Sequence, residues 1–358
     1  MLGIQKTITE YFWRSLFIIC WGVSLSKKIL VTGGAGYVGS VLIPKLLAKN
    51  YEVIVYDLMI YGDEGLPKGN SHLKIVKADI RDIDTFTKTL AGVDTVLHMA
   101  CISNDPSFEL DPALSRSVNF ECFEPMVIAA KKAGVKRFIY VSSSSVYGVS
   151  DAPEVTETHP LVPLTDYNKY KGLCEPLLFK HQSPDFTCLT IRPATVCGYS
   201  PRMRLDLSVN ILTNLAVNKG TITVFGGAQK RPNVHVDDLA DLYVDLMEIP
   251  AKDIQGEIFN YGHQNHTIAE MALMVKKVVE TEFPEKGPIK IETTVSNDLR
   301  SYHVSSKKIL AKLGKAPRRS VEDAVRDLCR AIKTGKLPNS LTDKKYFNVQ
   351  QMKEVSFR

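Results

Sequence analysis

The 358-residue sequence lacks the residue spacings that mark disulfide-rich and metal-binding proteins. Its seven cysteines are scattered, their number is odd, and no CxxC motif occurs. This distribution argues against a disulfide framework and against a zinc site, and it is typical of proteins from a reducing cytosol. The eight histidines show no HExxH or comparable spacing. We therefore expect no metal site and a cytoplasmic location.

The chain also lacks a concentrated basic patch and a long apolar run. The net charge of +6 is spread over the whole sequence, so nucleic acid is not an expected partner, whereas anionic small molecules such as phosphates are. The apolar stretch 11–25 is interrupted by Arg14 and is shorter than the ~20 residues that span a bilayer. We therefore expect no stable membrane insertion. Residues 1–26 are either a weak interfacial anchor or the product of a misplaced start, and we prefer the second interpretation.

Six apolar runs rich in β-branched residues predict buried strands. Helical patterns, such as the one at 111–132, fill the gaps between them. Strands that alternate with helices form a parallel sheet covered on both faces, and right-handed crossovers give it a doubly wound topology. The sequence therefore predicts an α/β, Rossmann-like fold. The expected strands are 27–32, 51–57, 73–79, 94–100, 136–143 and 186–193.

The pattern changes after Pro193, where loops lengthen and helical periodicity dominates. The run "TITVFGG" (221–227) looks like a short isolated strand. Two helices are expected to begin at capping boxes, Thr267 with Glu270 and Ser320 with Asp323, and the second to end at Gly335. We expect a sheet domain at 27–196, to which about 233–262 returns, a smaller and mostly helical substrate-binding region at 197–232 and 263–340, and a C-terminal tail at 341–358.

A glycine cluster follows the first expected strand and opens a helix. The sequence "TGGAGYVG" supplies Gly33, Gly36 and Gly39, which let the backbone approach a pyrophosphate at the helix N-terminus. Asp57 ends the second strand about 20 residues later, where a carboxylate binds the ribose 2′-hydroxyl. Because this carboxylate would repel a 2′-phosphate, the pattern favours NAD over NADP.

The stretch "YNKYKGLCE" places Tyr167, Lys171 and Glu175 four residues apart, on one face of a helix. A phenol titrates near ~10, and an ammonium group one turn away would lower that pKa. The pair is therefore a candidate general base. Glu175 is interpreted as a partner on the same helix face rather than as a catalyst.

Together these motifs resemble the extended short-chain dehydrogenase/reductase family, specifically its branch of NAD-dependent nucleotide-sugar epimerases and dehydratases. The resemblance runs from about Lys27 to about Leu337. The motifs that carry it are "TGGAGYVGS", "VYD", "KADIRD", "VLHMA", "VNF", "VSSSSVYG", "YNKYK", "IRPATVCG", "RPNVHVDDLADL" and "DLRSYHVSSKKI".

The resemblance assigns roles to individual residues. It implies that Ser143 is the catalytic hydroxyl, with Ser144 or Ser145 as alternatives, that Tyr167 is the base, and that Lys171 also binds the cofactor ribose. The implied cofactor-binding residues are Gly33, Gly36, Tyr37, Val38, Gly39, Asp57, Asp79, Ile80, His98, Ala100, Asn119, Tyr167, Lys171 and Pro193. The implied substrate-binding residues are Ser103, Asn104, Ser144, Arg204, Arg231 and Arg300, and the last two match positions that commonly hold a diphosphate.

The resemblance also narrows the reaction. Dehydratases of this family carry an Asp-Glu pair after the catalytic hydroxyl, and this chain has Ser144 and Ser145 there. We therefore expect a nucleotide-sugar epimerase that oxidises one sugar carbon, most plausibly C4, and returns the hydride to the other face. A dehydrogenase or ketosugar reductase with net redox is the alternative, and a non-catalytic NAD-binding regulator is a second one. The resemblance further implies a homodimer through 111–132 and 166–182, and a place in surface-polysaccharide synthesis.

Overall fold

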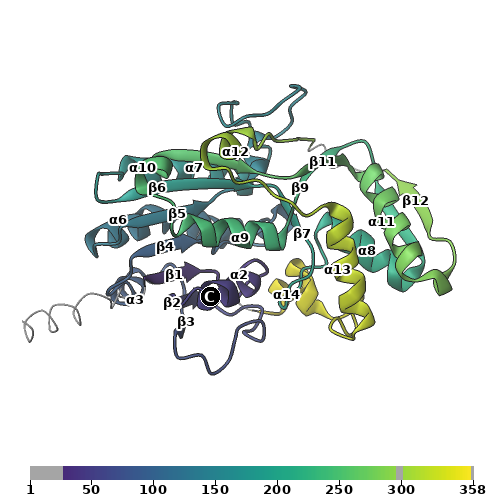
Figure 1. Cartoon of the computed structure of the whole chain (residues 1–358), viewed down its shortest axis with the longest axis horizontal. Helices are drawn as coiled ribbons and strands as arrows, with labels where there is room; N and C mark the ends of the chain where they lie inside the picture. Colours follow the sequence, from purple (N-terminus) through teal and green to yellow (C-terminus); the bar gives the residue numbers. More distant parts are fainter. Residues whose placement is uncertain (1–26, 296–300, 356–358) are drawn as a thin grey trace, which may run out of the picture.

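A seven-stranded parallel sheet forms the centre of the molecule, and the computed structural model describes residues 27–295 and 301–355. The strand order is β10-β6-β5-β4-β1-β2-β3 (Figure 1). The strands are β1 Lys28–Thr32, β2 Glu52–Asp57, β3 Leu73–Lys77, β4 Thr95–His98, β5 Arg137–Val141, β6 Thr187–Pro193 and β10 Glu257–Tyr261. The predicted doubly wound α/β fold is confirmed, and β10 is a seventh strand from the segment expected to return to the sheet.

Helices cover both faces of this sheet, as the alternation of side chains along each strand requires. Ile29 and Val31 of β1 face a core that they share with α2 (Gly39–Ala48) and α9 (Val236–Leu246). Leu30 points to the opposite core. That second core also contains side chains of α3 (Ile83–Thr89), α6 (Phe123–Lys132) and α7 (Asp166–Lys180).

The order of the strands locates the ligand site. β1 lies between β2 and β4, so the chain leaves β1 toward one side of the sheet and returns on the other. In open α/β sheets, ligands bind outside the carboxyl ends of the strands at such a switch point. The glycine turn after β1 and the loop after β4 meet there, because a Cβ added to Gly33 would lie 2.8 Å from the backbone of Ala100.

The region expected to bind substrate has its own core. It is built from α8 (Ser208–Lys219), α11 (Ile268–Glu282) and α13 (Val321–Lys333), which lie on the opposite side of the molecule from α6 and α10 (Ala251–Ile254) in Figure 1. Both predicted capping boxes are present, at the starts of α11 and α13. Residues 221–225 are not an isolated strand. They form β8 (Thr221–Phe225), which pairs in parallel with β12 (Lys290–Thr294).

Several shorter elements complete the fold. The expected helix at 111–132 is interrupted, because a π-helical turn, η1 (Ser117–Glu121), lies between α5 (Pro112–Arg116) and α6. Residues expected only as a tail fold into α14 (Asn348–Glu354), which lies between α2 and α13 in Figure 1. The other elements are α4 Asp105–Phe108, η2 Ser144–Tyr147, β7 Thr195–Cys197, β9 Lys230–His235, β11 Gln264–Thr267, η3 Pro284–Lys286, α12 Lys307–Leu313 and η4 Lys344–Tyr346.

Within the described residues, no helix is both long enough and apolar enough to cross a bilayer. The stretch 1–26, for which a weak anchor or a misplaced start is expected, lies outside them.

Candidate active site

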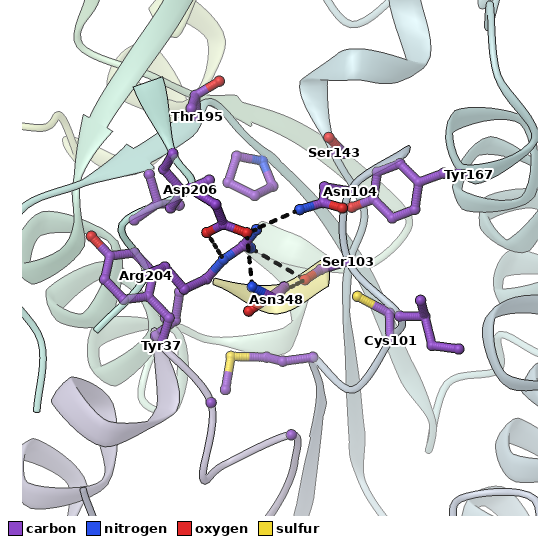
Figure 2. A pocket seen from close by; sticks show the side chains of 18 of the residues that line it. Tyr37, Cys101, Ser103, Asn104, Ser143, Tyr167, Thr195, Arg204, Asp206 and Asn348 are labelled. Atoms are coloured by element: carbon purple, nitrogen blue, oxygen red, sulfur yellow. Dashed lines mark hydrogen bonds and ion pairs between the residues drawn. The ribbon is translucent and has the colours of Figure 1, made fainter. Parts of the chain in front are cut away.

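A cavity of about 680 Å³ lies at the carboxyl edge of the sheet and extends into the helical region. Side chains from both parts of the molecule line it (Figure 2). Most of the residues predicted from the sequence are brought together on its wall: Gly33, Gly36, Tyr37, Val38, Gly39, Asp57, Asp79, Ile80, Ala100, Ser103, Asn104, Ser143, Ser144, Tyr167, Lys171, Pro193, Arg204 and Arg231. Arg300 lies outside the described residues.

The glycine turn has the geometry of a pyrophosphate cradle. Gly33 has a φ of +73° and a Cβ there would collide with Ala100, whereas a Cβ at Gly36 would meet only the Gly33 carbonyl oxygen, at 3.1 Å. In the described chain, no side chain caps the N-terminus of α2, and its first turn carries no acidic residue. The N–H groups of Ser40, Val41 and Leu42 already bond the carbonyls of Gly36 and Val38. The remaining N–H groups of this helix end are available to an anion, and the helix dipole favours one there.

Two carboxylates follow on the cofactor side of the cavity. Asp57 accepts backbone N–H groups from Ala35 at 3.0 Å and Met59 at 2.8 Å. Burial raises the pKa of Asp57, and these two N–H groups oppose that rise. Asp79 forms an ion pair with Arg81 at 2.6 Å. Although burial alone would raise it, the pKa of Asp79 is held below its usual value by Arg81. The two N–H groups of Ala35 and Met59 hold Asp57 rigidly at the position where a ribose hydroxyl is expected.

The predicted base and its partner share one face of α7, but they are not a simple pair. The Lys171 ammonium donates to the Val141 carbonyl oxygen at 2.8 Å and lies 5.1 Å from the ring centre of Tyr140. Burial raises the pKa of Tyr167 well above its usual value, Cys101 and Asp105 raise it further, and Arg204 opposes them. The pKa of Tyr167 in the chain by itself is therefore raised rather than lowered, and Lys171 is not among the main groups that act on it. The buried ammonium is directed to a backbone oxygen of β5.

Ser143 lies at the end of β5, where its side chain caps η2. Its Oγ lies 2.7 Å from Ser145 Oγ and accepts the Ser145 backbone N–H at 3.2 Å. The Ser145 hydroxyl in turn donates to the side-chain oxygen of Asn168. Ser143, Ser144 and Ser145 all line the cavity with Tyr167. The Ser145 hydroxyl is already donated to Asn168, and Ser143 is less buried than the other two, so these contacts favour Ser143 over Ser145 as the catalytic hydroxyl.

Two predicted cofactor residues, His98 and Asn119, are not on the cavity wall. His98 is buried behind it, with Nδ1 2.8 Å from Thr32 Oγ1, and its ring is stacked on Tyr140. Burial lowers the pKa of His98 to about 3, with a smaller effect from Lys171. Asn119 bonds both the N–H and the carbonyl of Ile102, at 2.8 and 2.9 Å. Their observed contacts hold the strand ends and loops that carry the wall.

The substrate side of the cavity contains two residues that the sequence did not indicate. Asp206 accepts Arg204 Nε at 3.0 Å and Nη2 at 3.1 Å, Asn104 Nδ2 at 3.3 Å, and the backbone N–H of Asn348 at 3.2 Å. Asn348 is the first residue of α14 and donates to Ser103 Oγ at 3.0 Å. Figure 2 shows these groups joined across the cavity wall. We call these five residues the Asp206 cluster.

Arg231 marks the end of the cavity that lies in the helical region. It is buried, its Nη1 donates to the Lys230 carbonyl at 2.9 Å, and its guanidinium lies 5.5 Å from the ring of Tyr302. A planar cation in a buried wall matches the oxygens of a diphosphate. The glycine turn on the sheet side and Arg231 on the helical side are therefore candidate anion sites in one cavity.

A second cluster of polar groups lies away from this cavity. The ligand atoms of His235, Asp237 and Asp327 lie within 4.8 Å of one another, and none of the three residues lines the cavity. Asp237 is already paired with Lys45 at 2.8 Å, which reduces the negative charge available to a cation. The expectation of no metal site stays a prediction. The six cysteines in the described ranges carry free thiols.

Comparison with known proteins agrees with this geometry. The family model "NAD dependent epimerase/dehydratase family" matches residues 29–262. A UDP-glucose 4-epimerase of Lactobacillus helveticus is 28% identical over 324 residues, which cover 83% of this chain and 94% of that protein.

Two solved structures share the fold over most of this chain. UDP-glucose 4-epimerase from Thermotoga maritima with UDP-glucose has a TM-score of 0.75 and 26% identity, and covers 86% of this chain and 99% of its own. The dTDP-glucose 4,6-dehydratase DesIV from Streptomyces venezuelae, with NAD bound, has a TM-score of 0.77 and 25% identity, and covers 88% and 100%. NAD is therefore the cofactor that the glycine turn and Asp57 are built to hold. This chain belongs to the NAD-dependent epimerase/dehydratase family.

Proposed function

We propose that this protein is a nucleotide-sugar epimerase that uses NAD to oxidise one sugar hydroxyl, at C4, transiently. One observation carries the proposal: a single cavity joins the glycine turn, the Tyr167 face of α7, Ser143 and Arg231. A dinucleotide in the cradle and a nucleotide sugar anchored at Arg231 would therefore bring their reacting ends together beside Tyr167.

The side chains divide the work between binding and proton transfer. Tyr167 takes the proton of the sugar hydroxyl, and Ser143 orients the reacting oxygen. Bound NAD supplies a hydride acceptor and the positive charge of its nicotinamide ring. Lys171 stands one helix turn below Tyr167, with its ammonium fixed by Val141. Arg231, and Arg300 by the family resemblance, hold the diphosphate.

The residues after Ser143 favour epimerisation over dehydration. Loss of water from the sugar needs an additional acid and base, which family dehydratases supply as an Asp-Glu pair. Here Ser144 and Ser145 stand in those positions, and both side chains are buried. The similarity to UDP-glucose 4-epimerases supports the same conclusion. In an epimerase the keto sugar rotates in the site and takes the hydride back from the reduced cofactor on its other face. No second redox partner is therefore required.

A dehydrogenase or ketosugar reductase with net redox is the alternative, and a non-catalytic NAD-binding regulator is the second. The presence of Tyr167, Lys171 and Ser143 on one cavity wall favours an enzyme over a regulator. Product analysis separates the other two. Incubation with a panel of nucleotide sugars, with and without added NADH, yields a product of unchanged mass for an epimerase and a mass shift of two hydrogens for net redox.

The Tyr167→Phe variant tests the assignment of the base. We expect turnover to fall by about 10²–10⁴-fold while NAD remains bound, because the ring is kept and only the proton acceptor is lost. Tyr170→Phe is the matched control, since Tyr170 lies on the same helix and packs against Phe108 and Phe120. Wild-type turnover by Tyr167→Phe would refute the assignment.

The remaining expectations about assembly and location are part of the proposal. A homodimer would pair the surfaces of α6 and α7, and the exposed Leu173 on α7 supports this. Sedimentation velocity on wild type and Leu173→Glu tests it, with a shift to monomer expected for the variant. A cytoplasmic location agrees with the six free cysteines of the described residues.

A further inference from the structure

The C-terminal helix α14 inserts a polar side chain into the cavity. Asn348 is 1% exposed and lines the cavity. Its Nδ2 donates to Ser103 Oγ at 3.0 Å, and its Oδ1 accepts Arg202 Nη2 at 2.6 Å. Gln351, one turn further along α14, donates to the Ile60 carbonyl at 3.2 Å. Asn348 is therefore held from both sides of the cavity, and α14 forms part of its wall.

The groups around Asn348 still have hydrogen-bonding capacity. An amide nitrogen carries two N–H groups, and only one of those on Asn348 is used in its bond to Ser103. Ser103 Oγ accepts from Asn348 and from Arg204 Nη1 at 3.2 Å. Its own O–H proton is therefore available to an acceptor in the cavity. Uncharged donors and acceptors of this kind match the hydroxyl groups of a sugar.

Two carboxylates offset the two arginine charges in the same wall. Arg204 makes two bonds to the Asp206 carboxylate. Arg202 is stacked 3.7 Å from the ring centre of Tyr61 and bonded to Asn348, and the negative charges of Asp206 and Asp57 act on it. A sugar carboxylate would have to compete with Asp206 for Arg204 and would lie close to its negative charge. The wall therefore disfavours a uronic acid.

Resting on the proposed function, we propose that Asn348 is a sugar-contacting residue and that the Asp206 cluster selects a neutral, hydroxylated sugar. The C-terminal helix then completes the sugar site from a part of the chain more than 140 residues beyond Asp206. Within the cluster, Asp206 positions Arg204, Asn104 and the start of α14, whereas Asn348 and Ser103 face the sugar hydroxyls.

The test is equilibrium binding to the full chain loaded with NAD, measured by titration calorimetry with UDP-glucose, UDP-glucuronate and UDP. For wild type we expect UDP-glucose to bind at least about tenfold more tightly than UDP-glucuronate. Asn348→Ala should weaken UDP-glucose about three- to tenfold, the effect of losing one neutral hydrogen bond, and leave UDP unchanged. Gln351→Ala on the same helix is the matched control, because Gln351 does not line the cavity.

The possible outcomes separate this inference from the proposed function. If Asn348→Ala weakens UDP as much as UDP-glucose, leaves both unchanged, or lowers the NAD content, Asn348 does not contact the sugar and the inference fails. Tighter wild-type binding of UDP-glucuronate also overturns it. If wild type binds neither UDP-glucose nor UDP, the nucleotide-sugar function itself is refuted. Should Asn348→Ala not fold, Ser103→Ala carries the same expectation from the opposite side of the wall.

Discussion

The helix α7, which carries the proposed base Tyr167, is attached to the sheet by a buried ion pair, whose loss should be costly. Glu175 lies on the face of α7 that carries Tyr167 and Lys171. Its carboxylate accepts Arg192 Nε at 2.9 Å and Nη2 at 2.5 Å. Both side chains are 3% exposed. Arg192 also donates to the Tyr147 hydroxyl at 2.6 Å, and Ser142 donates to Glu175 at 2.7 Å.

Removing the carboxylate leaves the Arg192 cation buried without its counter-charge. Breaking a buried pair in this way costs about 3–5 kcal/mol, so Glu175→Ala should lower the folding equilibrium constant about 150- to 5000-fold. Glu175→Gln keeps the shape of the side chain and the bond to Ser142, so this variant should lose less stability than Glu175→Ala. Combining Glu175→Leu with Arg192→Met removes both charges and should recover much of the stability.

The assay is urea denaturation followed by circular dichroism, with turnover measured on the folded fraction. The control is Glu124→Ala, which removes a pairing with Lys180 and His181. Since Lys180 is 65% exposed, this change should cost no more than about 1 kcal/mol. If Glu175→Ala loses no more stability than Glu124→Ala, or if the double variant is as unstable as Glu175→Ala, the reasoning is refuted.

Three other changes test separate parts of the site. Gly33→Ala should cost about 1–3 kcal/mol and weaken NAD binding, because Gly33 combines a φ of +73° with the contact to Ala100. Gly134→Ala has a φ of +82° in open space and measures the backbone effect alone. The pKa of His98 is lowered to about 3 in the folded chain. Between about pH 6.5 and 3, this imidazole therefore binds a proton in the unfolded chain but not in the folded one. Stability should therefore fall by about 2 kcal/mol between pH 6.5 and 5, and His98→Gln should remove that dependence. Although burial alone would raise it, Arg204 holds the pKa of Asp206 below its usual value. The advantage of wild type over Asp206→Asn should then be full above about pH 4 and disappear as the pH falls through the lowered pKa. Urea midpoints measured across pH decide both cases, and a constant difference between wild type and variant would contradict them.

Much of the fold could be predicted because its signals are local. Five of the six predicted strands are runs of apolar residues buried on both sides. The expectation of burial is wrong for the run at 73–79, because β3 lies at the edge of the sheet and is largely exposed. The capping boxes at Thr267 and Ser320 are satisfied within one helix turn. The glycine turn and Asp57 lie about 20 residues apart in one βαβ unit, so their meeting follows from the topology. The pairing of β8 with β12 could not be predicted in this way, because the two strands are far apart in the sequence, on either side of α11.

The cavity wall on the substrate side shows where local signals end. Asp206 and Asn348 carry no motif, and each is an ordinary polar residue in its own segment. Their role appears only when the loop after β4, the segment before α8 and the C-terminal helix α14 converge on one carboxylate. The sequence could place a basic residue such as Arg204 near the substrate. It could not identify the carboxylate that pairs with Arg204, and therefore could not tell whether its charge is available to a ligand.

The pair Tyr167 and Lys171 gives the most instructive difference between spacing and structure. A spacing of four predicts correctly that both side chains lie on one face of α7. It does not determine where the ammonium is directed, because a long side chain seeks the nearest strong acceptor, here the Val141 carbonyl at 2.8 Å. Burial of the phenol then dominates, and the pKa of Tyr167 rises. Tyr167 therefore stays protonated at neutral pH in the chain alone, and additional positive charge beside the phenol is required before it can act as the proposed base. It follows that proton removal should depend on the oxidised, positively charged form of the cofactor, and that the NADH-loaded protein should not deprotonate a sugar hydroxyl.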